Sequence, residues 1–230
     1  MKTKSPAKSS RESAPRKKRI LIVDDHAIVR EGLAEVINHE PDMEVCGQTG
    51  NAFEALAMAA STKADLAVVD ITIGGKNGLE LIKDFQVQQP DLAILVLSAH
   101  DENLYAERVL RAGGRGYVMK AEGGERFIAA LRQVLTGEIS VSPKVAAKVV
   151  NLFSGRPVDI SPVERLTDRE LQIFQLIGAG QDNNRVADHL HISPKTVEAH
   201  RAHIKEKLQI ASSAELISFA ARWIESNGTM

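Results

Sequence analysis

Short aliphatic runs alternate with longer amphipathic segments over residues 20–135. Five runs start about every 23–26 residues: Ile20–Val23, Met43–Cys46, Leu66–Val69, Leu92–Leu97 and Gly116–Met119. Runs of this length predict buried strands, and the segments between them have the period of helices. Strands that alternate with helices favour a parallel sheet covered on both faces. We therefore predict a doubly wound α/β domain with five parallel strands.

Apolar residues that recur every three or four positions predict which helix faces are buried. Between the first two runs, one such face contains Ile28, Val29, Leu33, Val36 and Ile37. Further along, Ser142 and Pro143 have the order typical of a helix N-cap and a first helical residue. We expect the helix that they begin to continue through Phe153.

The last part of the chain has helical periodicity and no strand pattern. Thr167 and Glu170 have the spacing of a capping box, and three more helices are predicted to start near Asp182, Ser193 and Ser213. The predicted inward residues of the four helices are Leu171, Phe174, Ile177, Val186, Ala187, Leu190, Val197, Ile204, Leu208, Leu216, Ile217 and Ala220. Two helices joined by a tight turn are typical of the helix-turn-helix unit, so we predict an all-α domain of this type.

The composition is that of a soluble globular protein: 43% of the 230 residues are hydrophobic and 26% are charged,. The single cysteine, Cys46, excludes an internal disulfide framework,. The longest aliphatic run, Leu92–Leu97, is too short to cross a bilayer,, and the N-terminus lacks the apolar core of a secretory signal. We expect a cytoplasmic protein with no membrane association.

The formal net charge of −1 conceals an uneven distribution. Residues 1–19 carry eight Lys or Arg and one Glu, with too few aliphatic residues to bury a core, and predict a disordered basic tail,. A solubilising extension explains this tail more simply than attraction to nucleic acid does. We divide the rest into the α/β domain at 20–136, a linker with a helix at 137–161 and the helical domain at 162–230.

Polar side chains follow four of the five predicted strands. Asp24 and Asp25 follow the first strand, Asp70 the third, Ser98 ends the fourth and Lys120 follows the fifth. Carboxyl ends of parallel strands meet at one edge of a sheet, which is where such sheets bind ligands. Three carboxylates there suit a hard cation such as Mg²⁺, and a carboxylate beside it can attack phosphorus to form an acyl phosphate. The ammonium and the hydroxyl would bind the phosphoryl oxygens.

Each of these residues has an ordinary explanation when taken alone. Asp25 suits a helix N-cap, Lys120 a solvated side chain and Ser98 a loop hydroxyl, but their joint placement on successive strand ends favours a functional site. Aspartate-based phosphatases need a second acid two residues after the nucleophile, where this chain has Thr72. The sequence contains no P-loop and no dinucleotide fingerprint,. We therefore do not expect an enzyme with a small substrate of its own.

The segments LIVDDHAIVREGL, AVVDITI, ILVLSAH and GYVMKAE occur in this order and resemble the receiver domain of bacterial two-component response regulators, which has a flavodoxin-like fold. The resemblance covers residues 20–135. It implies these roles: Asp70 as phosphoacceptor; Asp24, Asp25, Asp70 and the backbone oxygen of Thr72 as Mg²⁺ ligands; and Ser98, Lys120 and Tyr117 as switch residues. Gly74-Gly75 departs from the family, which usually has Pro-Gly there.

Residues 162–228 resemble the LuxR-type helix-turn-helix, through the opening LTDRE, the core ISPKTVEAH and the ending KL. The residues expected to contact DNA lie on the third helix: Lys195, Thr196, Glu198, Ala199, Arg201, Ala202 and Lys205. Asn184 and Glu198 replace lysines that are frequent in relatives. Charge alone leaves DNA binding open, because residues 166–230 carry seven Lys or Arg against eight Asp or Glu,.

The whole chain thus resembles a response regulator of the NarL/FixJ type. The resemblance implies that a sensor histidine kinase phosphorylates Asp70, which switches homodimer formation and binding to double-stranded DNA. Phosphorylation would turn Tyr117 inward, and the segment 136–165 would then release the third helix of the helical domain. The alternative is an adaptor that binds partner proteins through both domains, which the acidic balance of the helical domain favours.

Overall fold

The computed structural model describes residues 16–73, 77–155 and 161–227, so most of the predicted basic tail and the Gly74-Gly75 pair lie outside the described residues. Five parallel strands form one sheet in the order β2-β1-β3-β4-β5. Their bounds are β1 Lys18–Val23, β2 Met43–Thr49, β3 Leu66–Val69, β4 Ala93–Ser98 and β5 Gly116–Met119. The predicted five-stranded doubly wound domain is confirmed, and β1 begins two residues before the aliphatic run.

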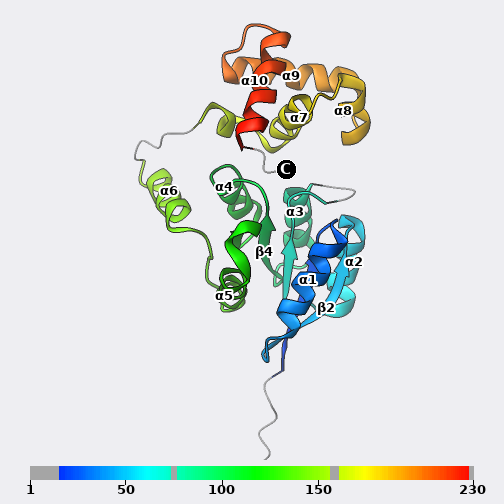
Figure 1. The fold of residues 1–230 in the computed structure, drawn as a ribbon, viewed down its shortest axis with the longest axis vertical. Coiled ribbons are helices and arrows are strands. Elements are labelled where there is room, and N and C mark those ends of the chain that lie inside the picture. Colours follow the sequence, from blue (N-terminus) through cyan, green and yellow to red (C-terminus); the bar gives the residue numbers. More distant parts are fainter. Residues whose placement is uncertain (1–15, 74–76, 156–160, 228–230) are drawn as a thin grey trace, which may run out of the picture.

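The helices cover both faces of the sheet, as Figure 1 shows. Their bounds are α1 Ala27–Asn38, α2 Ala52–Thr62, α3 Gly78–Gln88, α4 Glu102–Ala112 and α5 Gly123–Leu135, with a short 3₁₀ helix η1 at Lys120–Glu122. The sheet has a hydrophobic core on each face, and alternate residues of β1 belong to different cores. Ile20 and Ile22 pack with α1 and α5, whereas Leu21 and Val23 pack with α2, α3 and α4. This alternation follows from the two-residue repeat of a strand.

The buried face predicted for α1 is partly wrong. Ile37 is buried and Val29 and Leu33 are half-buried, but Ile28 is 85% exposed and Val36 is 38% exposed. At 100° per residue, Ile28 lies opposite the stripe that runs from Val29 to Ile37. The helix turns this stripe toward the sheet, and Ile28 therefore faces solvent.

A linker helix, α6 (Pro143–Phe153), follows the receiver-like domain. The hydroxyl of Ser142 accepts a hydrogen bond from the amide of Val145, as the N-cap prediction requires. Val145 is buried, whereas Phe153 is 90% exposed. The helix therefore packs on the molecule with one side, since Val149, four residues after Val145, is also partly buried against the core.

The helical domain contains η2 Pro162–Arg165, α7 Asp168–Gly178, α8 Asn183–Leu190, α9 Pro194–Leu208 and α10 Ser213–Asn227. The capping box of Thr167 and Glu170 is present, and Ser193 caps α9. The predicted inward residues are buried or half-buried with one exception, Ile217, which is 44% exposed. The prediction that Ile217 faces inward is wrong, because the buried side of α10 is centred on Leu216 and Ala220.

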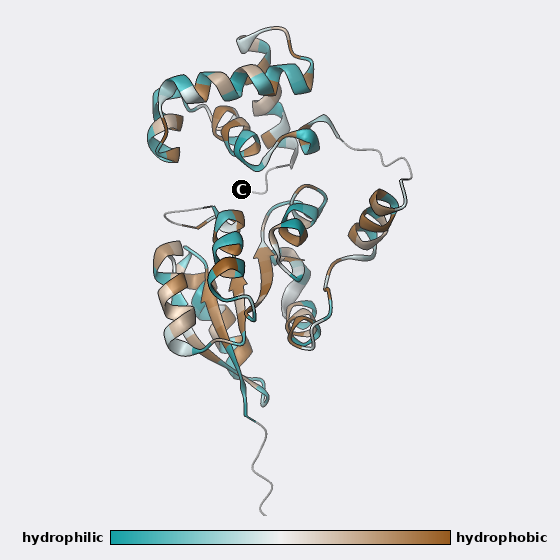
Figure 2. Cartoon of the chain, turned by 180° about the vertical axis from the view of Figure 1, so that it is seen from behind, coloured by the Kyte–Doolittle hydropathy of each residue, from teal (hydrophilic) through white to brown (hydrophobic). Residues whose placement is uncertain are grey.

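Apolar residues concentrate on the strands and on the inner sides of the helices, while the outer sides are polar (Figure 2). Among the described helices, none is both long and apolar enough to span a bilayer. Both views place α7 nearer to the receiver-like domain than α9, which lies on the far side of the helical domain.

Candidate functional site

Asp24 and Asp70 follow neighbouring strands at one edge of the sheet. Val23 and Val69 are paired in the register of β1 and β3, and the amide of Asp70 donates to the carbonyl of Val23 at 2.8 Å. Both residues are buried, with 2% exposure for Asp24 and 5% for Asp70. Two carboxylates held this close in a poorly solvated place need a cation.

Lys120 supplies that cation from the end of β5. Its Nζ donates to Oδ2 of Asp24 and to Oδ2 of Asp70, both at 2.7 Å. Burial raises the pKa of Asp70 above its usual value, although Lys120 opposes this shift. Burial also lowers the pKa of Lys120, but the hydrogen bonds to the two carboxylates outweigh it and the net shift is upward. The ammonium is therefore firmly charged.

A cluster of possible metal ligands surrounds this ion pair. Ligand atoms of Asp24, Asp25, His26 and Asp70 all lie within 4.8 Å of one another. Carboxylate oxygens are the ligands that hard divalent cations prefer, so the donor set fits such an ion. The side chain of Asp25 is 36% exposed and its Oδ1 is 2.7 Å from Nδ1 of His26. His26 was not selected from the sequence; its position directly after the acidic pair was the available signal.

Ser98 ends β4, the strand next to β3 in the sheet, and Tyr117 lies in the neighbouring β5; both are almost fully buried. The Ser98 hydroxyl accepts from the amide of His100 at 3.3 Å, and the Tyr117 hydroxyl donates to the carbonyl of His100 at 2.7 Å. Burial raises the pKa of Tyr117 well above its usual value, so its phenol is protonated. Tyr117 is 2% exposed in this state. Its burial therefore does not await phosphorylation, contrary to the expected inward turn.

The segment after Asp70 is packed closely against α3. A Cβ atom added to Gly78 would lie 2.3 Å from the carbonyl oxygen of Asp70, so only glycine allows this approach. Thr72 donates its amide to Oδ1 of Asp70 at 3.4 Å, and its hydroxyl is 3.1 Å from Nε2 of His100. The metal-binding role of the Thr72 backbone oxygen stays a prediction.

His100 is a second residue of the site that the sequence analysis did not select. It is two residues beyond Ser98, and its ring lies over that of Tyr105 with the centroids 4.9 Å apart. Burial lowers the pKa of His100 below its usual value, although Asp70 opposes the shift. The only signal in the sequence was the position of His100 two residues after Ser98, the end of a predicted strand.

The outer face of α9 carries the residues predicted to contact DNA. Five of them are exposed and two, Arg201 and Lys205, are half-buried; the exposed ones are Lys195, Thr196, Glu198, Ala199 and Ala202. Arg201 donates from Nη1 to Oδ1 of Asn183 in α8 at 2.7 Å. The expectation that α9 must be released is wrong for this state, because most of its polar face is already open to solvent.

Buried charge holds α9 in place. Glu170 of α7 is 4% exposed and accepts from Nζ of Lys207 at 2.6 Å and from the amide of Thr167 at 2.8 Å. Burial raises the pKa of Glu170, but the bonds from Lys207 and Thr167 outweigh it and the net shift is downward. This buried ion pair ties the end of α9 to the start of α7.

Comparisons with known proteins agree with both halves of this description. Residues 20–132 match the response regulator receiver domain, and residues 164–220 match the luxR family of bacterial regulatory proteins. The oxygen regulatory protein NreC of Staphylococcus carnosus (strain TM300) is 35% identical over 210 residues, which cover 89% of this chain and 97% of that protein. NreC of Staphylococcus haemolyticus (strain JCSC1435) is 36% identical over 210 residues, which again cover 89% of this chain and 97% of that protein.

Solved structures share the fold. The RcsB response regulator of Salmonella typhimurium aligns with a TM-score of 0.70 at 21% identity, covering 90% of this chain and 98% of that chain. A two-component response regulator of the LuxR family from Aurantimonas sp. SI85-9A1 aligns at 0.56 with 30% identity, covering 60% of this chain and 99% of that chain. With the family matches and full-length relatives, these findings place the chain among the NarL/FixJ-type response regulators, DNA-binding transcription regulators that join a receiver domain to a LuxR-type helix-turn-helix.

Proposed function

We propose that Asp70 is the phosphoacceptor of this response regulator and that its phosphorylation by a sensor histidine kinase switches dimer formation and DNA binding. The observation that carries the proposal is the bridge from Lys120 to Asp24 and Asp70. A buried carboxylate with an ammonium at 2.7 Å is placed both to act as a nucleophile and to have its product neutralised,.

The chemistry follows from the contacts of Asp70. One carboxylate oxygen attacks phosphorus, the bond from phosphorus to the donor group breaks, and the donor leaves with the electron pair. The product is an acyl phosphate on Asp70. Nζ of Lys120 then binds a phosphoryl oxygen instead of the free carboxylate, and the Ser98 hydroxyl donates to another. These two groups stabilise the added negative charge in a place that is poorly solvated.

Asp24, Asp25 and Asp70 are the residues that would hold Mg²⁺, and their oxygen donors fit it,. The ion would offset the repulsion between the carboxylates and the incoming phosphoryl group. Asp24 already accepts from the amide of His26 at 2.8 Å, which fixes the direction of its carboxylate.

The proposed partners follow from the helical domain and from the relatives. RcsB of Salmonella enterica serovar Typhimurium has been seen bound to a promoter in the presence of the phosphomimetic BeF3-, and two RcsB dimers have been seen bound to two parallel DNAs. We extend this to a homodimer on double-stranded DNA, with the polar face of α9 toward the major groove. A cytoplasmic location goes with these partners.

Intact-protein mass spectrometry tests the phosphoacceptor. The wild type and Asp70→Asn are incubated with acetyl phosphate and Mg²⁺, and we expect one phosphoryl group on the wild type and none on the variant. A variant that gains the same mass would place the phosphoryl group elsewhere. With a kinase in hand, unchanged kinase-stimulated DNA binding by Asp70→Asn would refute the switch.

The adaptor alternative rests on the acidic balance of the helical domain. A series of gel shifts over salt concentration distinguishes it from DNA binding, because phosphate contacts make affinity fall steeply with salt. We expect that steep fall; a domain that retains no duplex from any genomic fragment at low salt would favour the adaptor.

A further inference from the structure

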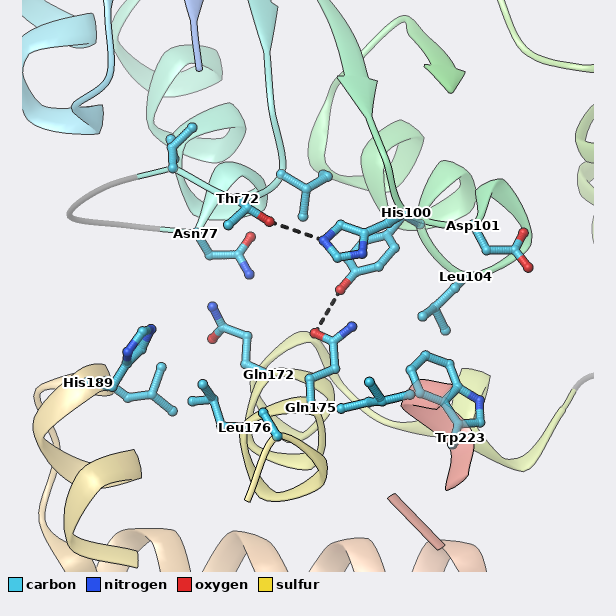
Figure 3. A pocket seen from close by; sticks show the side chains of 16 residues that line it. Thr72, Asn77, His100, Asp101, Leu104, Gln172, Gln175, Leu176, His189 and Trp223 are labelled. Atoms are coloured by element: carbon cyan, nitrogen blue, oxygen red, sulfur yellow. Dashed lines mark hydrogen bonds between the residues drawn. The ribbon is translucent and has the colours of Figure 1, made fainter. Parts of the chain in front are cut away.

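A cavity of about 390 Å³ lies between the receiver domain and the helical domain (Figure 3). At its wall, the hydroxyl of Tyr105 in α4 donates to Oε1 of Gln175 in α7 at 3.0 Å. One turn further along α4, Nη1 of Arg108 donates to Oδ1 of Asp168 at the start of α7 at 2.9 Å. The volume falls in the range of cavities that bind small molecules.

Most of the described residues that line this cavity are apolar. Leu104 of α4, Leu176 of α7 and Ile224 of α10 contribute aliphatic surface. Trp223 of α10 also lines the cavity and is half-buried. Such walls favour a ligand with flat apolar rings, because burial of apolar surface and stacking on an indole both stabilise a complex.

Three carboxamides also line the cavity, and the oxygen of each is bonded within the protein. Oδ1 of Asn77 accepts from the amide of Leu79 at 2.8 Å, and Oε1 of Gln172 accepts from Nη1 of Arg169 at 3.1 Å. Oε1 of Gln175 has the bond from α4 described above. These bonds fix which end of each carboxamide is the nitrogen, since the orientation follows from the hydrogen-bond network.

The three carboxamide nitrogens are donors that face the cavity. Among the contacts of the described residues none of the three has an acceptor, and in the same part of the chain no buried side-chain nitrogen lacks one, so these nitrogens are open to the cavity. Figure 3 shows the nitrogens of Asn77 and Gln172 turned toward each other across the space between the domains. Donors on apolar walls suit a ligand that carries acceptor atoms.

The charges of the wall favour an uncharged ligand. The described lining residues include no lysine or arginine, and Asp101 is the only carboxylate among them. Burial lowers the pKa of His100 and raises the pKa of Tyr105 to about 12, so both side chains are neutral near pH 7. An anion would meet a carboxylate without a fixed positive charge to compensate it, and a cation would face the donor nitrogens.

We propose that this cavity binds a small uncharged heteroaromatic molecule of one or two fused rings. Its ring-nitrogen or carbonyl acceptors take hydrogen bonds from the three carboxamides, and its rings pack on Trp223. The lining residues include none of the carboxylates proposed to hold Mg²⁺, so binding does not require phosphorylation of Asp70. Because both domains contribute to the wall, the ligand binds the chain only with its two domains together.

Quinoxaline and naphthalene test the site in the full-length chain. The two molecules have the same shape, but only quinoxaline has ring nitrogens that accept hydrogen bonds. Trp223 is the single tryptophan, so fluorotryptophan incorporated in its place gives one fluorine NMR signal from the cavity wall. We expect quinoxaline to shift this signal saturably, with half-saturation at about 1 mM. The absence of a saturable shift up to the solubility limit of quinoxaline would overturn the proposal.

Two variants each remove one donor and keep its internal bond. Asn77→Asp retains the oxygen that caps α3, and Gln172→Glu retains the oxygen that binds Arg169. Gln88→Glu is the matched control, because it adds the same charge at an exposed residue of α3 that does not line the cavity.

We expect quinoxaline to bind about tenfold more weakly to both donor variants. Naphthalene binding in these variants, and quinoxaline binding in the control, should change by less than about twofold, because neither depends on the lost donor. Wild-type affinity for quinoxaline in both donor variants would overturn the role of the carboxamides. Equal losses for quinoxaline and naphthalene would overturn it as well, since they would show a deformed cavity instead of a missing hydrogen bond.

Discussion

At the residue scale, the geometry of the site depends on a close approach between two backbone segments, which one added methyl group would block. Gly78 begins α3 directly against the backbone of Asp70, and its amide donates to the carbonyl of Ile71 at 2.9 Å. A methyl group there has no flexible side chain to push aside, because the nearest atoms are backbone. The position of Asp70 and the start of α3 are therefore set by the same contact.

We expect Gly78→Ala to destabilise the receiver domain by about 1–3 kcal/mol through overpacking. Gly32→Ala is the control, because a Cβ at Gly32 meets nothing within 4 Å and alanine is favoured in a helix by roughly 1 kcal/mol. Thermal unfolding followed by circular dichroism checks both. A Gly78→Ala variant that unfolds at the same temperature as Gly32→Ala, or at a higher one, would contradict this packing argument.

The contacts of a single residue, Glu170, also predict how the stability of the helical domain depends on pH. The pKa of Glu170 is held below its usual value of 4.5 despite burial, by the bonds from Lys207 and Thr167. A carboxylate with a lowered pKa stabilises the fold above its unfolded pKa, and this contribution is lost as pH falls through the lowered value.

We therefore expect Glu170→Gln to lower the unfolding free energy by about 1–3 kcal/mol near pH 7 and to flatten the loss of stability below pH 4.5. The single tryptophan, Trp223, packs against Phe174 with ring centroids 5.6 Å apart, so its fluorescence reports on this domain. Denaturant titrations at several pH values measure the effect. The argument fails if wild type and variant lose stability in parallel on acidification.

At the element scale, α9 combines a buried stripe with an exposed polar face. Val197 and Ile204 are fully buried, while the positively charged Lys195 projects from the first turn into solvent. A lysine in contact with a phosphate contributes to the number of counterions released on binding. Its contribution is therefore visible as a change in salt dependence even when the operator is unknown.

We expect Lys195→Ala to weaken binding to a random-sequence duplex and to reduce the slope of log affinity against log salt by about 1. Lys144→Ala on α6 is a control of equal charge outside the helical domain. Fluorescence anisotropy over a range of salt concentrations measures both slopes. An identical slope for Lys195→Ala and the wild type would remove Lys195 from the interface.

At the scale of the whole molecule, the proposed function requires an acidic edge of one domain to influence a helical domain. The receiver match ends at residue 132 and the luxR match begins at residue 164, but Arg108 and Tyr105 bring the two domains into direct contact. In the proposed function the acidic cluster of Asp24, Asp25 and Asp70, which would hold the cation, is the entry point of this influence. Removal of divalent cations should leave the carboxylates to repel the incoming phosphoryl group.

We expect excess chelator to abolish the mass gain from acetyl phosphate and with it any phosphorylation-induced self-association, and added Mg²⁺ to restore both. The self-association is followed by sedimentation velocity on the same samples. Full phosphorylation in the presence of chelator would mean that Lys120 alone neutralises the site.

Much of this molecule was determined by its sequence. The strand runs are local features, and so are the helix caps at Ser142, Thr167 and Ser193. The order of Asp24, Asp70 and Lys120 at strand ends is local as well. Backbone preferences and hydrophobic periodicity make these features readable along the chain. The resemblances to known families added roles to those positions. The exposure of Ile28 and Ile217 was misjudged because a helix with apolar residues around a wide arc does not reveal which part of the arc meets its neighbours.

Tertiary structure alone decided how the domains and side chains meet. Three features could not be read from the sequence: the bonds from Arg108 to the start of α7, the packing of the His100 ring on Tyr105, and the burial of Tyr117 without phosphorylation. Each of them involves residues that are distant in sequence or depends on the direction of a side chain. Periodicity reports which residues are apolar and how they repeat. It carries no information on which partner a polar side chain finds, because that is set by the three-dimensional approach of separate elements.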